Sequence, residues 1–443
     1  MSSTPVDSRS VVEAIARRHE EPDWFLEKRR RALQAYLDGP VPDRVHHLWR
    51  YTDPQDLLPG EEAFGLPAGP PAAGGFPPTL EALFTRGEVS GAVFVDESGR
   101  ARIRLSKSLE QTGVRVLDMH QALHDAPELL KEHLGSLVRP VVTKEGFGKL
   151  EALNFALWSG GTVISVPKNV VVEKPIHVWV ESPGAAAGVD SYFATRLLIL
   201  VGEGSDVTVV DECEGGGGGV RYNSAVELHA ARGSRARHVA VQRLDGSVAY
   251  HASQRSSAAR DTQLLTAVAS LGSRITKSDF GTFLDGPGAH VELFGFLFGE
   301  GKQRFDHHTV HHHRSGRTHS NLDFKVVLKD RSRSAYTGLI RIEPGCPESE
   351  AYQENRNLLL NDGAKAESIP ELEILTDEVK CTHGATMGTL DPQHIFYLTS
   401  RCIDRPEAIR LIVGGFIEPT LSRLAEDLRD RLRGHVETRI KDL

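Results

Sequence analysis

The pattern of apolar and polar residues divides the chain into regions of different predicted structure. Residues 8–38 carry apolar side chains at helical spacing, from Val11 to Leu37, and this spacing predicts a helix that ends before Gly39. Residues 59–78 are rich in Gly, Pro and Ala, a composition typical of a flexible linker. We therefore assign residues 1–58 to an N-terminal helical region that precedes this linker.

Residues 79–140 alternate short helical and extended patterns and predict a small mixed α/β region. From about Gly161 onward, short extended runs follow one another as far as Ile342, separated by small or charged turn residues. We assign residues 141–390 to one mainly β core.

A loose repeat runs through this core. Turn residues recur at intervals of 27 to 29 residues, near Gly204, Gly233, Arg260, Gly288 and Gly316. A period of this length is typical of a solenoid, in which each coil of strands buries its inner face against its neighbours. A β-sandwich with the same number of strands would also satisfy the pattern, so the periodicity leaves both folds open.

The last region, residues 391–443, returns to helical spacing. Asp391 followed by proline is a helix start, and Pro419 predicts the start of a further helix. In the helix around residues 405–418, four residues make the surface more apolar than one buried stripe requires: Ile409, Ile412, Val413 and Phe416. They either pack against a neighbouring helix or form a surface for a partner.

The stretch 379–388 carries the first candidate chemistry. If it is a strand, Cys381 and His383 point to the same face, about 7 Å apart along the chain. A thiolate and a neutral imidazole are both metal ligands, but a closed zinc site usually needs four. The remaining ligands must come from elsewhere, or the pair is a structural strand end.

A histidine-rich stretch is the second candidate for metal chemistry. Five of the seven residues from His307 to His313 are histidine, and His319 follows shortly after. As a strand it would place His307, His311 and His313 on one face and His308 and His312 on the other. Imidazoles suit zinc, copper, iron or nickel, but this division works against a compact site.

Charge and composition exclude several functions. A net charge of −8 argues against a nucleic-acid binder. No apolar run is long enough for a membrane span, and the polar start of the chain is not a secretory signal. The four cysteines lie far apart, which favours a reducing cytoplasm over a disulfide framework.

Motifs for nucleotide hydrolysis are incomplete. Gly-x-Gly-Lys stretches end at Lys149 and Lys302, and neither lysine is followed by Ser or Thr. We therefore expect that this chain does not hydrolyse ATP by itself.

Several stretches resemble the SufB/SufD family of iron–sulfur cluster assembly proteins. They occur in the family's order: 47–52 with Trp-Arg-Tyr-Thr, 152–154, 166–176, 329–333, 351–360, 381–386 and 396–398. The Cys-x-His-Gly-Ala-Thr form at 381–386 is SufD-like, and no clustered cysteine motif of the SufB kind is present near the start.

The resemblance implies a right-handed parallel β-helix between helical ends, and a SufD-like scaffold role in a complex with a SufB-like subunit and a SufC-like ABC ATPase. It implies a transient iron–sulfur cluster at the SufB interface, with His383 as a ligand and Cys381 beside it. His308 and His313 fall where family members carry histidine and are lesser metal candidates. The terminal helices would hold the ATPase, and alone the chain would form a homodimer.

Two other functions stay open at this point. One is a stand-alone metal-dependent enzyme built on the histidine-rich stretch, which would need a full ligand set within one chain. The other is a purely structural partner that stabilises a SufB-like subunit, for which His383 would be dispensable.

Overall fold

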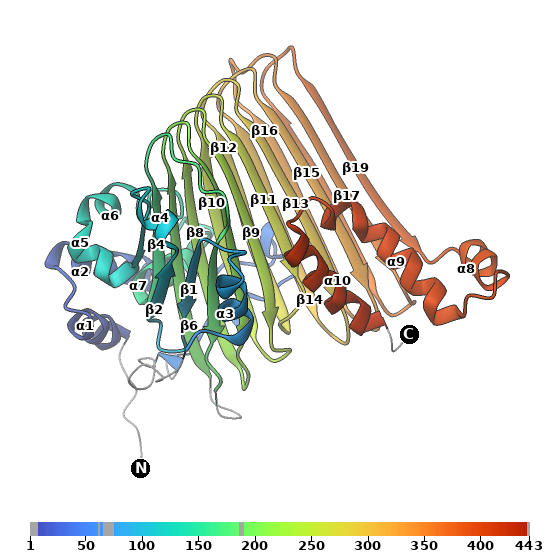
Figure 1. Cartoon of the computed structure of the whole chain (residues 1–443), viewed down its shortest axis with the longest axis horizontal. Coiled ribbons are helices and arrows are strands. Elements are labelled where there is room, and N and C mark those ends of the chain that lie inside the picture. Colours follow the sequence, from blue (N-terminus) through green and yellow to red (C-terminus); the bar gives the residue numbers. More distant parts are fainter. Residues whose placement is uncertain (1–7, 61–62, 65–74, 186–189, 441–443) are drawn as a thin grey trace.

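The computed structural model describes residues 8–60, 63–64, 75–185 and 190–440. Most of the expected linker, residues 61–62 and 65–74, lies outside the described residues. Two long sheets face each other and run the length of the molecule, with helices at both ends and along one side (Figure 1). The chain is mainly β, and its parallel strands stack as a β-solenoid, as the sequence predicts.

The ten-stranded sheet has the order β19 (Lys380–Thr389), β17 (Glu350–Leu359), β15 (His319–Leu328), β13 (His290–Gly299), β11 (Gln263–Ser270), β9 (Arg235–Leu244), β7 (Asp206–Gly215), β5 (Ile176–Ser182), β1 (Gly91–Val95), β2 (Ala101–Leu105). The nine-stranded sheet has the order β18 (Lys365–Ile374), β16 (Arg333–Ile342), β14 (Arg304–His313), β12 (Ile275–Leu284), β10 (Ala249–Ala258), β8 (Val220–Ala230), β6 (Ser191–Val201), β4 (Gly160–Val166), β3 (Arg115–Asp118). Only β1–β2 and β3–β4 pair antiparallel among the described strands. Because every other pair is parallel, the open choice between sandwich and solenoid is settled in favour of the solenoid.

Each coil advances the chain by nearly the predicted period. Gln263 pairs with Arg235, 28 residues earlier, and with His290, 27 residues later. At one corner, a left-handed residue in each coil donates its backbone N–H to a carbonyl of the next coil; these residues are Gly204, Gly233, Asp261, Gly288, Arg317 and Glu348. The sequence repeat therefore arises from a stacked row of turns. It is weak because only half of the turn positions are glycine.

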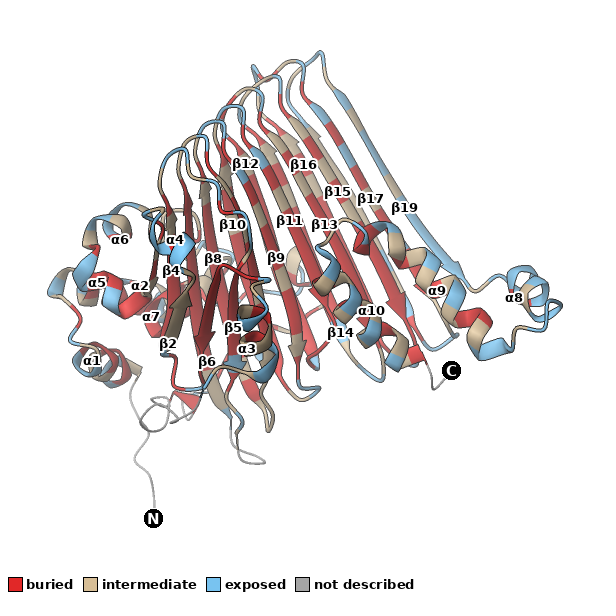
Figure 2. Cartoon of the chain, viewed as in Figure 1, coloured by how far each residue is buried: buried red, intermediate tan, exposed pale blue. Residues whose placement is uncertain are grey.

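The space between the sheets is the main core. Near the N-terminal end it is filled by aliphatic side chains such as Val209 and Leu228, and near the C-terminal end by larger ones such as Phe324 and Tyr336. Burial falls off sharply in the last coil, where β19 is almost wholly exposed (Figure 2).

The helices that come before β4 in the chain are α1 (Ser8–Arg18), α2 (Asp23–Asp38), η1 (His47–Trp49), η2 (Pro54–Asp56), α3 (Pro78–Thr85), α4 (Lys107–Glu110), α5 (Met119–Asp125), α6 (Pro127–His133) and α7 (Lys149–Leu157). The single helix predicted for residues 8–38 is wrong, because it is two helices. Glu20 has a left-handed backbone and Pro22 has no N–H to continue the ladder, so α1 and α2 separate there.

The C-terminal helices are α8 (Pro392–Thr399), α9 (Arg405–Leu421) and α10 (Glu426–Ile440). Pro419 does not start a helix but lies in the last turn of α9, which therefore lacks the backbone hydrogen bond that an N–H at residue 419 would donate to Gly415. Among the described residues, no helix is both long and apolar enough to cross a bilayer.

Candidate functional site

The last coil of the solenoid is left open. β18 and β19 are the final strands of their sheets, so in the part of the chain that the structure describes each has one backbone edge with no strand paired to it. Figure 2 shows β19 exposed along nearly its whole length, in contrast to the buried strands behind it. An exposed strand edge is a template for pairing with another chain.

Cys381 and His383 point toward the interior of this open coil. Register partners in a parallel sheet project to the same face, and these two residues pair with Ala351 and Gln353. Both partners are almost completely buried inside the solenoid. His383 is nevertheless exposed and Cys381 only half-buried, because no further coil covers them.

Amide side chains of β17 support the strand from within. Asn357 donates one hydrogen bond to the backbone oxygen of Thr386, at 3.1 Å, and another to the side-chain oxygen of Asn355, at 2.7 Å. Gln353, next to His383, reaches across to the backbone oxygen of Gly338 in the other sheet. The motif 351–360 therefore holds β19 in place rather than forming a ligand set.

The two candidate ligands differ in what surrounds them. Cys381 packs on the core cluster that contains Phe324 and Tyr336, and this partial burial raises the pKa of its thiol. It is therefore a thiol at neutral pH, and a cation would have to displace its proton. The imidazole of His383, being exposed, offers its nitrogens directly to a ligand from outside.

The pair does not complete a cation site within the described residues. The one group there with three or more His, Cys, Asp or Glu ligand atoms close enough to share a cation is Glu151, His251 and Asp279. Neither Cys381 nor His383 belongs to it. The shortage of ligands noted from the sequence therefore remains in the folded chain.

The histidine-rich strand β14 is divided between two faces, as predicted. His307, His311 and His313 lie inside the solenoid and are fully buried. His307 meets the hydroxyl of Ser270 at 3.1 Å, and both ring nitrogens of His313 bond to hydroxyls. Burial lowers the pKa to about 3 for His307 and His311 and to about 4 for His313, so all three are neutral.

The other histidines of β14 face outward. His308 is buried under the N-terminal segment, with Nε2 2.9 Å from Asp306, while His312 bonds to Glu343 at 2.7 Å. His308 and His313, the lesser metal candidates, thus lie on opposite faces of one strand. This separation weighs against an enzyme built on the histidine-rich stretch.

The apolar residues of α9 are mainly used in packing. Ile409 and Val413 are buried against the outer face of the ten-stranded sheet, and Ile412 and Phe416 are half-buried there. The most exposed large apolar side chains of the C-terminal helices are other residues, on α8 and on the outer side of α9: Phe396, Tyr397 and Leu411. The sequence motif that contains Phe396 gave no sign of this exposure.

Several of the recognised motifs hold distant segments together. Lys277 donates to the backbone oxygen of Leu48 and lies over the ring of Trp49, which fixes the 47–52 motif on the nine-stranded sheet. Lys329 donates to the last turn of α10, at the oxygen of Arg439. These motifs are therefore structural.

The comparisons with known proteins agree with this architecture. The family model described as SUF system FeS cluster assembly, SufBD core domain, matches residues 184–416. The iron–sulfur cluster assembly protein SufD of Bacillus subtilis is 27% identical over 98% of this chain and 98% of its own length.

Two further relatives match at similar levels. SufB of the same organism is 25% identical over 94% of this chain and 89% of its own length. A SufBD family protein of Pyrococcus horikoshii is 26% identical over 94% of this chain and 93% of its own. Identity to SufD thus slightly exceeds identity to SufB, in line with the SufD-like form of residues 381–386. The stacked coils, the motif order and the family model together show that this chain belongs to the SufB/SufD family of iron–sulfur cluster assembly proteins.

Proposed function

We propose that the chain is a SufD-like, non-catalytic scaffold subunit that assembles iron–sulfur clusters together with a SufB-like subunit. The observation that carries the proposal is the open coil. Two ligand-type side chains point into an interior that has no cover, next to two strand edges without partners. A second solenoid docked end to end would both pair the edges and enclose His383 and Cys381.

The cluster would be cargo, held only while it is built. His383 would be the principal ligand, because its imidazole is exposed and not protected by burial. Cys381 would be secondary, because burial keeps its thiol protonated. The docked subunit would supply the remaining ligands, which accounts for the small number on this chain.

The C-terminal helices would dock a SufC-like ATPase, which would carry out the ATP hydrolysis that the motifs of this chain do not support. α9 and α10 are anchored on the sheet by a continuous apolar cluster. α8 lies beyond β19 at the far end of the molecule (Figure 1) and exposes Phe396 and Tyr397, which are 73% and 57% accessible. Exposed aromatic residues of this kind favour a protein interface.

In the absence of the SufB-like subunit, a second copy of the chain would cover the same edges. We therefore propose a two-fold homodimer through β18 and β19 in isolation, and a cytoplasmic location. Light scattering of the purified chain at micromolar concentration tests the dimer, which a monomeric mass would exclude.

The test of function is anaerobic co-expression with the SufB-like and SufC-like subunits, followed by iron and sulfide analysis. His383→Ala should abolish cluster assembly with the complex intact, since an exposed imidazole contributes little to folding. Cys381→Ser should reduce assembly less. Normal assembly by the His383 variant would leave only a structural role for this chain.

A further inference from the structure

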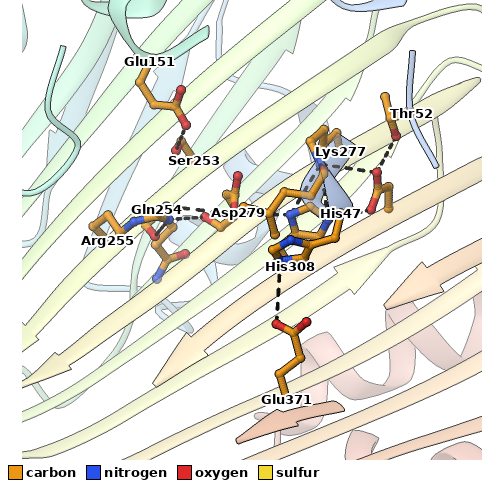
Figure 3. Close-up of polar contacts among 12 residues, drawn as sticks. His47, Thr52, Glu151, Ser253, Gln254, Arg255, Lys277, Asp279, His308 and Glu371 are labelled. Carbon is orange, nitrogen blue, oxygen red and sulfur yellow. Dashed lines mark hydrogen bonds and ion pairs between the residues drawn. The ribbon is translucent and has the colours of Figure 1, made fainter. Parts of the chain in front are cut away.

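A second group of ligand-type side chains lies away from the open coil, on the outer face of the nine-stranded sheet. Glu151 comes from α7, His251 from β10 and Asp279 from β12. One ligand atom of each lies within 4.8 Å of the others. Figure 3 shows Glu151 and Asp279 with their polar neighbours above the strands.

The fold brings these three residues together by sheet register and by the docking of one helix. His251 pairs with Lys277, and Ser253 with Asp279, so all four side chains project to one face. α7 is fixed above them by Asn154, which donates to the backbone oxygen of Asn223 at 2.9 Å. Since more than a hundred residues separate Glu151 from Asp279, no sequence motif could have shown this group.

The hydrogen bonds of His251 leave one nitrogen free to act as a ligand. Its Nδ1 lies 3.1 Å from Oδ1 of Asn223. The amide nitrogen of Asn223 donates to the backbone oxygen of Leu150, which fixes the orientation of that amide. Nδ1 of His251 must therefore carry the proton, and the lone pair lies on Nε2. This is the arrangement by which neighbouring groups orient a metal-binding histidine.

The protonation states of His251 and Asp279 also suit metal binding. Burial lowers the pKa of His251, so that the ring is neutral at pH 7. Burial alone would raise the pKa of Asp279, but His308 and Arg255 outweigh it and the net shift is downward. A neutral imidazole and an ionised carboxylate are the forms that bind a cation.

The basic side chains near Asp279 make their shorter contacts with other groups. His308, the nearest, has Nδ1 3.7 Å from the Asp279 carboxylate but Nε2 2.9 Å from Asp306. Arg255 stands 4.0 Å from the Asp279 carboxylate and donates instead to the backbone oxygens of Gln254 and Asp279, at 2.9 and 2.8 Å. Lys277 is bound to Asp306 and to Leu48. Glu151 accepts one hydrogen bond from Ser253, at 2.9 Å, and keeps its other oxygen free of any hydrogen bond described for it.

The group opens into a cavity of about 780 Å³, which also has His47, Trp49 and His308 in its wall. The cavity separates the sheet from the N-terminal segment and leaves room for water or a small ligand beside the three side chains. Three protein ligands with an open side are typical of a reactive or exchangeable metal site rather than a closed structural one.

We propose that Glu151, His251 and Asp279 bind a divalent transition-metal ion of the Fe²⁺, Mn²⁺ or Zn²⁺ class, with its open positions facing the cavity. One imidazole with two carboxylates suits this class better than the soft thiolate-binding metals or Mg²⁺. Neighbouring ligand atoms of a tetrahedral ion with bonds of about 2.1 Å lie about 3.4 Å apart, so the side chains, now within 4.8 Å of one another, need to close by at most about 1.4 Å.

The test uses the full-length chain, freed of metal with a chelator and titrated anaerobically with Co²⁺, whose visible absorption reports the ligand set. Asp279→Asn and His251→Gln should each weaken binding at least tenfold. Asp206→Asn is the matched control, because its carboxylate is 22% exposed against 21% for Asp279 and pairs with arginines on the other sheet. It should bind like the wild type.

Two further results decide the proposal. If Asp279→Asn does not fold by circular dichroism, Glu151→Gln on α7 replaces it and must show the same tenfold loss. His383→Ala should leave Co²⁺ binding unchanged. The test of this metal site is therefore independent of whether His383 is a cluster ligand at the open coil. Wild-type titration curves for the Asp279, His251 and Glu151 variants would overturn the proposal, as would loss of Co²⁺ only in His383→Ala.

Discussion

The buried histidines of β14 predict that the solenoid loses stability in mild acid. His311 is the clearest case, because both of its ring nitrogens are buried without a hydrogen-bond partner among the described residues. Its pKa is lowered to about 3 by burial, against about 6.5 in an unfolded chain. We therefore expect His311→Leu to stabilise the protein, and to do so more strongly as the pH falls.

The magnitude follows from proton linkage. Between pH 6.5 and pH 3 the unfolded chain binds a proton at His311 that the native chain does not, so stability falls with decreasing pH. The slope is about 1.4 kcal/mol per pH unit, or about 2 kcal/mol from neutral pH to pH 5. With His307 and His313, whose pKa values are lowered to about 3 and about 4, the three histidines together cost about 6 kcal/mol over this range, comparable with the whole stability of many domains.

The assay is urea denaturation of wild type and His311→Leu at pH 7.5 and pH 5. At pH 7.5 the variant should gain about 1 kcal/mol from removal of the unpaired polar atoms. At pH 5 its advantage should grow by about 2 kcal/mol. Val310→Ala, the adjacent outward residue, is the control whose effect should not change with pH. An advantage of His311→Leu that is equal at both pH values would refute the reasoning.

Three further predictions concern other parts of the molecule. Lys277→Met should destabilise the chain by about 3–5 kcal/mol in the same assay, because it leaves Asp306 buried without the ammonium now 3.3 Å away; an unchanged unfolding midpoint would contradict this. Phe396→Asp should lower capture of a SufC-like ATPase at least tenfold in a pull-down without changing the unfolding midpoint, because the ring is exposed, whereas wild-type capture would remove α8 from the interface. Met387→Pro removes one N–H from the free edge of β19, because the N–H groups of Lys380 and of every second residue after it point to β17, and it should shift the isolated chain toward monomer in light scattering; an unchanged mass would place any dimer contact elsewhere.

The turn period indicated a solenoid but also fitted a β-sandwich, and the family resemblance supplied the choice of a β-helix. The period is visible in the sequence because it reflects a repeated physical constraint. Each coil must return the chain to the same corner, and small or left-handed residues recur there. The break between α1 and α2 was missed because the apolar stripe continues across Pro22, and a stripe carries no information on backbone hydrogen bonds. The position of Phe396 could not be judged, since exposure depends on what the solenoid covers.

The candidate site was only partly accessible to sequence reasoning. Alternation along one strand was enough to place Cys381 and His383 on a common face, and to divide His308 from His313. The group of Glu151, His251 and Asp279 was out of reach, because it depends on sheet register and on a helix that docks over two strands. Local patterns identify side chains that share an element, but not those that meet across elements.

The central claim, that His383 at the open coil is a ligand to a cluster shared with another subunit, is tested most directly by pulsed electron paramagnetic resonance. This chain alone is labelled with ¹⁵N-histidine, combined with an unlabelled SufB-like subunit and SufC-like ATPase, and the assembled cluster is reduced by one electron. We predict a strong ¹⁵N coupling to the cluster that disappears in His383→Gln. A coupling that persists in the variant, or a cluster with no ¹⁵N coupling in the wild-type complex, would contradict the claim.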